Sequence, residues 1–128
     1  MQEVPLESFD QIRTFAEITN ELIMKELSQE EWRAQLEKDP KAEIIDVRTE
    51  EELEAGYIPG AKNLDIYQGA EFIEEIEKLD PEKHYYLYCR SGKRSAQACA
   101  IMEQKGFKTT YNLKGGFSEW EGETSQDL

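Results

Sequence analysis

The stretch YYLYCRSGKR, residues 85–94, decides how the rest of the chain is interpreted. Its first four residues are three tyrosines and one leucine, which is typical of a β-strand because aromatic side chains suit a pleated surface. The strand signal ends at Cys89, and the residues after it are basic and include a glycine, which predicts a tight turn. Apolar residues then recur at helical spacing from about Arg94 to Lys105. The stretch therefore predicts a strand, a short loop and the start of a helix, with a cysteine where the strand meets the loop.

On both sides of this unit, short apolar runs alternate with longer acidic, amphipathic runs, which predicts βαβ units and a parallel sheet. The other strands are expected at residues 23–27, 43–47, 61–64 and 109–113. Further helical segments are expected after residue 28, after residue 49, and at 5–22, 71–79 and 117–120. We therefore divide the chain into an N-terminal helical extension, residues 1–22, and a main domain, residues 23–128.

Two capping boxes predict where two of the helices begin. They are Ser28 with Glu31 and Thr49 with Glu52, each a hydroxyl residue followed three positions later by a glutamate. The predicted helix after Ser28 should end at Asp39, because a proline follows it.

The composition limits the classes of partner. The chain has 128 residues, of which 38% are hydrophobic, enough for one compact domain with its own core. Its formal net charge of -13 repels the phosphates of nucleic acid and anionic lipid surfaces. No uninterrupted apolar run approaches the roughly 20 residues that span a bilayer, and residues 1–10 lack the features of a secretion signal. We expect no nucleic-acid or membrane partner and a cytoplasmic location.

The chain has two cysteines, Cys89 and Cys99. They are too few for a disulfide framework, and without a second Cys/His cluster they cannot form a structural zinc site. We therefore expect no metal and no cofactor. Cys99 shares a predicted helical face with Ser95, Ala98 and Met102, so we expect it to pack in the core.

Cys89 is predicted to lie at the carboxyl end of a central parallel strand, where open α/β sheets bind their ligands. The residues of the following loop are Arg90, Ser91, Gly92, Lys93 and Arg94. A sharp turn here brings successive backbone N–H groups toward one point, and the helix dipole adds to their attraction for an anion. Three cationic side chains act in the same direction, so the pKa of the Cys89 thiol should be low and the residue should be a nucleophile at neutral pH.

Several stretches, in this order and spacing, resemble the single-domain rhodaneses, a family of sulfurtransferases. They are IIDVR (44–48) with GYIPGA (56–61), YCRSGKRS (88–95), and GF (106–107) with LKGGFSEW (113–120). The resemblance covers about residues 23–120. It implies a rhodanese/Cdc25-like α/β fold with a five-stranded, mostly parallel sheet and helices on both faces.

The same resemblance implies an activity and residue roles. Cys89 would carry a persulfide, residues 90–94 would cradle it, and Asp46 and Arg48 would form a scaffold pair that ties loops together without touching sulfur. The enzyme would be of the thiosulfate sulfurtransferase type, moving sulfane sulfur from a donor such as thiosulfate to cyanide or a thiol. A protein is a further candidate for the sulfur acceptor.

Other functions are known for this fold. One alternative is a non-catalytic binding module, a sulfur carrier or a redox sensor, although the Cys-x-x-Gly-x-Arg pattern is intact here. A Cdc25-like phosphatase is a third reading, but only four residues separate Cys89 from Arg94, where those enzymes have five. The only histidine, His84, should lie at the opposite end of the strand from Cys89 and is not expected to act as a base. The chain departs from the family pattern at Tyr57, Asp65 and Phe117.

Overall fold

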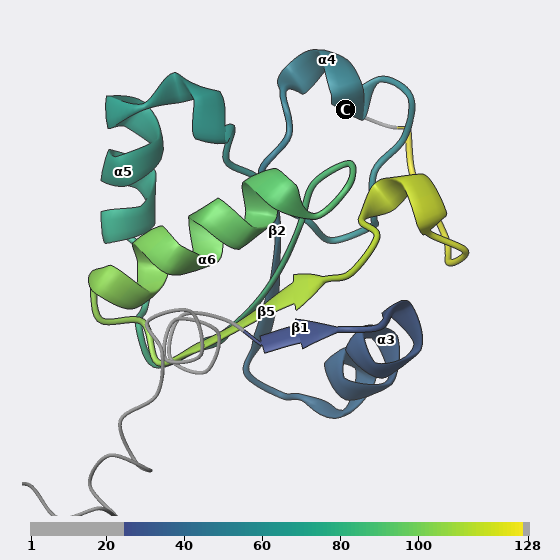
Figure 1. Ribbon diagram of the computed structural model, residues 1–128, viewed down its shortest axis with the longest axis horizontal. Coiled ribbons are helices and arrows are strands. Elements are labelled where there is room, and N and C mark those ends of the chain that lie inside the picture. Colours follow the sequence, from purple (N-terminus) through teal and green to yellow (C-terminus); the bar gives the residue numbers. More distant parts are fainter. Residues whose placement is uncertain (1–24, 127–128) are drawn as a thin grey trace, which may run out of the picture.

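The computed structural model describes residues 25–126 (Figure 1). In chain order the elements are β1 (Lys25–Leu27), α3 (Gln29–Lys38), β2 (Ala42–Asp46), α4 (Glu50–Leu53), β3 (Lys62–Asn63), the 3₁₀ helix η1 (Ile66–Gln68), α5 (Ala70–Glu77), β4 (His84–Tyr88), α6 (Lys93–Gln104), β5 (Thr109–Leu113) and the 3₁₀ helix η2 (Phe117–Glu119). The predicted helix at residues 5–22 lies outside the described residues, so the N-terminal extension stays a prediction.

β4 is the central strand of a five-stranded sheet with the order β1-β5-β4-β2-β3. All four neighbouring pairs are parallel. The predicted α/β class and the five-stranded sheet are therefore confirmed. β5 matches its predicted range residue for residue, and the bounds of β2, β3 and β4 differ from the predicted ones by no more than one residue. The predicted start of β1, residue 23, lies outside the described residues.

Both predicted capping boxes are present. The Ser28 hydroxyl accepts from the Glu31 N–H at 3.2 Å, and the Ser28 N–H donates to the Glu31 carboxylate at 3.2 Å. The Thr49 hydroxyl accepts from the Glu52 N–H at 3.3 Å, and the Thr49 N–H donates to the Glu52 carboxylate at 3.0 Å. The second box fixes the short helix α4, and with it the position of Glu52.

The sheet separates two hydrophobic clusters, one on each face. Tyr85, Leu87 and Cys89 belong to the cluster under α5 and α6, whereas Tyr86 and Tyr88 belong to the cluster that contains Trp32 of α3. Figure 1 shows α5 and α6 together on one side of the strands and α3 on the other. This period-two alternation along β4 directs the Cys89 side chain toward α6.

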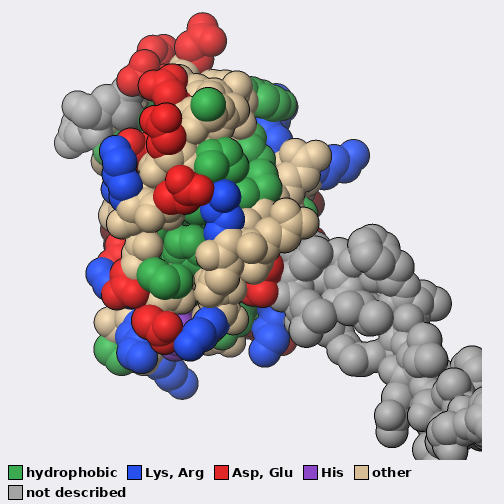
Figure 2. All heavy atoms as spheres, turned by 90° about the vertical axis from the view of Figure 1, so that its left-hand side faces the viewer, with side chains coloured by type: hydrophobic (Ala, Val, Ile, Leu, Met, Phe, Trp, Pro, Cys, Tyr) green, Lys and Arg blue, Asp and Glu red, His purple; other side chains and the backbone are tan. Residues whose placement is uncertain are grey.

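The surface of the described part is rich in acidic side chains. Figure 2 shows Asp and Glu gathered toward the upper part of one face, and Lys and Arg toward its lower edge. Tyr67, with 70% of its surface accessible, is the one strongly exposed large hydrophobic residue among those described. Within residues 25–126, no helix has the length and apolar character needed to cross a membrane.

Candidate active site

The loop between β4 and α6 surrounds the Cys89 sulfur with hydrogen-bond donors. The Gly92 N–H lies 3.0 Å from Sγ, and both the N–H and the hydroxyl of Ser95 lie 3.4 Å from it. Gly92 has a φ of +106°, in the left-handed region that side-chain-bearing residues rarely adopt, and this conformation turns its N–H back toward Cys89. Cys89 and Ser95 are fully buried. The arrangement is an anion-binding nest at the start of a helix.

Two opposing effects set the ionisation of Cys89. Burial disfavours the thiolate and raises the pKa, whereas hydrogen bonds from Ser95, Gly92 and Ser91 lower it. The hydrogen bonds prevail, so the pKa of Cys89 lies below the ordinary thiol value. Such a thiol is a nucleophile at lower pH than a free cysteine.

Asn112, a fully buried polar residue of β5, holds the loop from behind. Its Nδ2 donates to the Gly92 carbonyl at 3.0 Å and lies 3.4 Å from the Glu26 carboxylate. Its Oδ1 accepts from the Ser95 hydroxyl at 2.5 Å. The Ser95 hydroxyl has one proton and two acceptors within reach, Oδ1 and Sγ, so it stabilises a thiolate only by turning away from Asn112.

The segment that follows β5 also holds the Cys89 loop in place, through backbone hydrogen bonds; we call this segment, residues 116–118, the brace. The Phe117 N–H donates to the Cys89 carbonyl at 2.8 Å, and the Ser118 N–H donates to the Arg90 carbonyl at 3.0 Å. Gly116 has a φ of +61°, and a Cβ there would lie 2.5 Å from the Arg90 carbonyl oxygen and 2.6 Å from that of Cys89. The close contact between the two loops therefore requires glycine at this position.

The three loop cations differ in their surroundings. Arg94 forms a forked ion pair with Glu52, in which Nη1 lies 2.8 Å from Oε1 and Nη2 lies 2.9 Å from Oε2. Its guanidinium carbon also lies 5.3 Å from the centre of the Tyr67 ring. Arg90 and Lys93 are exposed, and neither forms an ion pair with another residue in the range 25–126. Three cationic side chains were expected to act together on Cys89, but the charge of Arg94 is already paired with Glu52.

Asp46 and Arg48 form a buried ion pair, with side chains only 1% and 4% exposed. Arg48 Nη2 lies 2.8 Å from the Asp46 carboxylate and donates to the Gly56 carbonyl, also at 2.8 Å. The Arg48 guanidinium carbon lies 4.4 Å from the centre of the Phe117 ring. The pair thus connects the end of β2 with the loop after α4 and with the brace behind Cys89.

All of these residues except Glu26 fall within a match to a known family. The chain matches the rhodanese-like domain family over residues 28–123. The chain belongs to this family. YtwF of Bacillus subtilis (strain 168) is 40% identical to it over 101 residues, which cover 79% of this chain and 94% of YtwF. A sulfurtransferase of Allochromatium vinosum is 34% identical over 98 residues, which cover 77% of this chain and 89% of that protein.

A solved structure agrees with the sequence comparison. The crystal structure of a rhodanese-like domain protein from Staphylococcus aureus superposes with a TM-score of 0.71 at 29% identity, covering 82% of this chain and 100% of the other. The resemblance to the rhodanese-like family is therefore confirmed. The named relatives support the coarser assignment of this chain as a transferase, a sulfurtransferase.

The other cysteine, Cys99, and the histidine, His84, lie outside the set of donors around Cys89 Sγ. Cys99 is fully buried in the cluster under α6, and burial raises its pKa to about 12. His84 begins β4, at the end of the strand opposite to Cys89, where its Nδ1 lies 2.7 Å from the Asp39 carboxylate. Neither residue is among the groups that donate a hydrogen bond to Cys89 Sγ.

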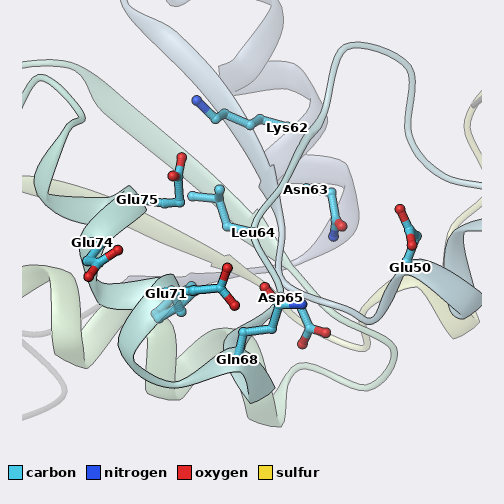
Figure 3. Close-up of a pocket in the computed structure, with 10 residues that line it drawn as sticks. Glu50, Lys62, Asn63, Leu64, Asp65, Gln68, Glu71, Glu74 and Glu75 are labelled. Carbon is cyan, nitrogen blue, oxygen red and sulfur yellow. The ribbon is translucent and has the colours of Figure 1, made fainter.

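A hollow of about 380 Å³ opens beside β3 and α5 (Figure 3). Most of the polar residues that line it are acidic: Glu50, Asp65, Glu71, Glu74 and Glu75. Cys89 is not among its lining residues, so the hollow is separate from the nest. No group of three His, Cys, Asp or Glu side chains within residues 25–126 is arranged to hold a metal ion.

Sequence reasoning missed Asn112 and Glu52. Asn112 had a signal, because it is a polar residue inside a predicted strand, residues 109–113, and a polar side chain buried in a sheet needs hydrogen-bond partners. Glu52 was recognised only as a capping residue, since a local pattern does not reveal a contact with Arg94, which lies 42 positions away. Both residues touch the loop only through tertiary packing.

Proposed function

We propose that the chain transfers sulfane sulfur through a persulfide on Cys89, from a donor such as thiosulfate to cyanide or a thiol. The observation that carries this proposal is the nest of N–H groups aimed at Sγ. A nest of this size suits one extra sulfur atom, because the loop has only four residues between Cys89 and Arg94.

The first half-reaction needs a nucleophile and no proton transfer. The Cys89 thiolate attacks the outer sulfur of thiosulfate, a new S–S bond forms, and the old S–S bond breaks with its electron pair leaving on sulfite. The terminal sulfur of the persulfide then carries the negative charge, which the loop N–H groups stabilise. Because no group has to be deprotonated by a base, the distance between His84 and Cys89 is no obstacle.

In the second half-reaction, cyanide attacks the terminal sulfur, thiocyanate leaves and the thiolate is restored. A thiol can attack in the same way once it is ionised, and it takes the sulfur as its own persulfide. Charge and atoms balance in both cases, so the cycle requires neither a metal nor an oxidant.

Intact-protein mass spectrometry tests the proposal directly. Thiosulfate should add one sulfur atom to the chain, and cyanide should remove it. Cys89→Ser should neither take up sulfur nor form thiocyanate, whereas Cys99→Ala should do both. Sulfur uptake by Cys89→Ser at the wild-type rate would show that another group is the nucleophile.

A sulfur carrier is the second candidate, and the complete burial of Cys89 favours it. A carrier would load one sulfur atom and release it only to a specific protein acceptor. An enzyme would form many equivalents of thiocyanate per chain. Counting thiocyanate against protein in a long incubation separates the two functions.

A further inference from the structure

The Glu52 carboxylate accepts hydrogen bonds from both terminal nitrogens of the Arg94 guanidinium and so occupies them. Both arms of the guanidinium fork donate to the carboxylate, and the two side chains are only 17% and 28% exposed. A planar, two-point contact of this kind uses the same N–H groups that would bind the oxygens of an anionic substrate. Arg94 is therefore not available to such an anion while the pair is formed.

Glu52 is held in place independently of Arg94. Its Oε1 accepts from the Thr49 N–H at 3.0 Å and from the Thr49 hydroxyl at 3.1 Å, as part of the capping box of α4. The hydrogen bond from Arg94 is the main reason that the pKa of Glu52 falls to about 2, so the carboxylate is charged at neutral pH. The capping box of α4 thus fixes the negatively charged carboxylate of Glu52 beside the Arg94 guanidinium.

Arg94 is also coupled to the sulfur. Its pKa is raised, chiefly by Glu52, and the charge of a Cys89 thiolate contributes to the same shift. Glu50 and Glu51 add two more carboxylates to the first turn of α4. The side of the loop that faces α4 is therefore neutralised or acidic, and the unpaired cations Arg90 and Lys93 are left as the other groups that could attract an anionic donor.

We propose, resting on the function proposed above, that Glu52 is a specificity residue that occupies Arg94 and so biases the site against dianionic sulfur donors. The donor class that suits the site carries its sulfane sulfur with at most one negative charge, as the persulfide of a thiol does. Glu52 acts through Arg94 and does not touch sulfur.

Two donors isolate the effect of charge because their chemistry is otherwise the same. Thiosulfate carries two negative charges and methanethiosulfonate carries one. In each case the thiolate attacks the outer sulfur and the S–S bond breaks, with the electron pair leaving on sulfite or on methanesulfinate. A change in the nucleophilicity of Cys89 affects both donors, whereas a change in the field at the loop acts about twice as strongly on the dianion.

Glu52→Gln is the informative variant. Glutamine keeps one oxygen for the capping box but loses the charge and replaces one acceptor of the Arg94 fork with an NH2 group. The ratio of kcat/KM for thiosulfate to that for methanethiosulfonate, with cyanide as acceptor, should rise roughly three- to tenfold at low salt. The change should lie mainly in KM for thiosulfate, and it should shrink in high salt.

Glu51→Gln is the matched control, because it removes the same charge from the same turn at an exposed position. It should shift the ratio by less than about twofold. An unchanged ratio in a folded Glu52→Gln variant, or an equal shift in both variants, overturns the inference.

A measurement on the unaltered protein keeps the inference testable if Glu52→Gln does not fold. The thiosulfate rate should stay level or rise as salt screens the repulsion, and a steep fall with salt would show that free cations attract the dianion. If neither donor adds sulfur to the unaltered protein, the proposed function fails instead.

Discussion

Asn112 shows how one buried side chain can set the behaviour of another that it does not touch. Its amide joins the Gly92 carbonyl to the Ser95 hydroxyl, and these two residues are the main donors around Sγ. We expect the positions of the Gly92 and Ser95 backbone N–H groups, and through them the lowered pKa of Cys89, to depend on this bridge. Asn112 is thus a positioning residue for the loop.

Asn112→Asp should raise the pKa of Cys89. Aspartate has the same shape, but it puts an acceptor where Nδ2 meets the Gly92 carbonyl, and its charge disfavours a nearby thiolate. The rate of iodoacetamide alkylation at Cys89 should rise with pH through a midpoint that lies at higher pH in the variant than in the unaltered protein. Peptide mass mapping separates this reaction from that of Cys99, which should stay unmodified while the protein is folded.

Asn63→Asp provides the control for this prediction. The Asn63 amide also bridges backbone, donating to the Asp46 and Arg48 carbonyls at 2.9 Å each, but its contacts belong to the β2–β3 region. It should lower thermal stability and leave the alkylation midpoint of Cys89 in place. If both variants moved the midpoint equally, loss of stability alone would explain the effect of Asn112.

Among the elements, the loop after β4 and the segment after β5 make a close backbone contact directly beside Cys89. Two backbone hydrogen bonds cross it, and Gly116 lies where they meet. Substituting Gly116 tests whether this contact is needed for the reactivity of Cys89 or only for the stability of the fold.

Gly116→Ala should reduce sulfur uptake by Cys89 at least tenfold, an order-of-magnitude figure for a displaced reactive group. The new Cβ would force the Cys89 and Arg90 carbonyls away from the Phe117 and Ser118 N–H groups. Gly60→Ala is a matched control, since Gly60 has a φ of +88° but a Cβ added there would meet no atom within 4 Å. Gly60→Ala should lose ~1 kcal/mol of stability from its positive φ alone, Gly116→Ala should lose more because of the added clash, and only Gly116→Ala should lose activity. Equal activities would contradict the role given to this contact.

The same elements show which parts of the structure the sequence predicted. The strand order along the chain, the cap residues of α3 and α4 and the full range of β5 followed from local patterns, because periodicity and capping depend on neighbouring residues. The nest at Cys89 was also expected, since strand, turn and helix lie in one continuous stretch. The pairing of Arg94 with Glu52 was not expected, because it depends on how α4 packs near the start of α6.

For the whole molecule, the excess of acidic groups predicts that salt stabilises the fold. The formal net charge of -13 makes the compact state repel itself, and screening reduces this repulsion. Raising sodium chloride from about 10 mM to about 300 mM should increase the melting temperature at neutral pH by a few degrees. Differential scanning calorimetry at fixed protein concentration measures this, and a melting temperature that falls with salt would mean that attractive ion pairs outweigh the repulsion.

Trp120 follows directly after the segment whose N–H groups hold the Cys89 and Arg90 carbonyls. Its indole lies edge-on to that of Trp32, with ring centres 5.7 Å apart, and these are the only tryptophans in the chain. If Cys89 takes up sulfur as proposed, we expect a shift of the loop to reach this indole pair, because the Phe117 and Ser118 N–H groups of η2 are hydrogen-bonded to the Cys89 and Arg90 carbonyls. The protein therefore carries an intrinsic fluorophore on the opposite face of the sheet from the sulfur, and its emission should report loading and unloading in real time without a label.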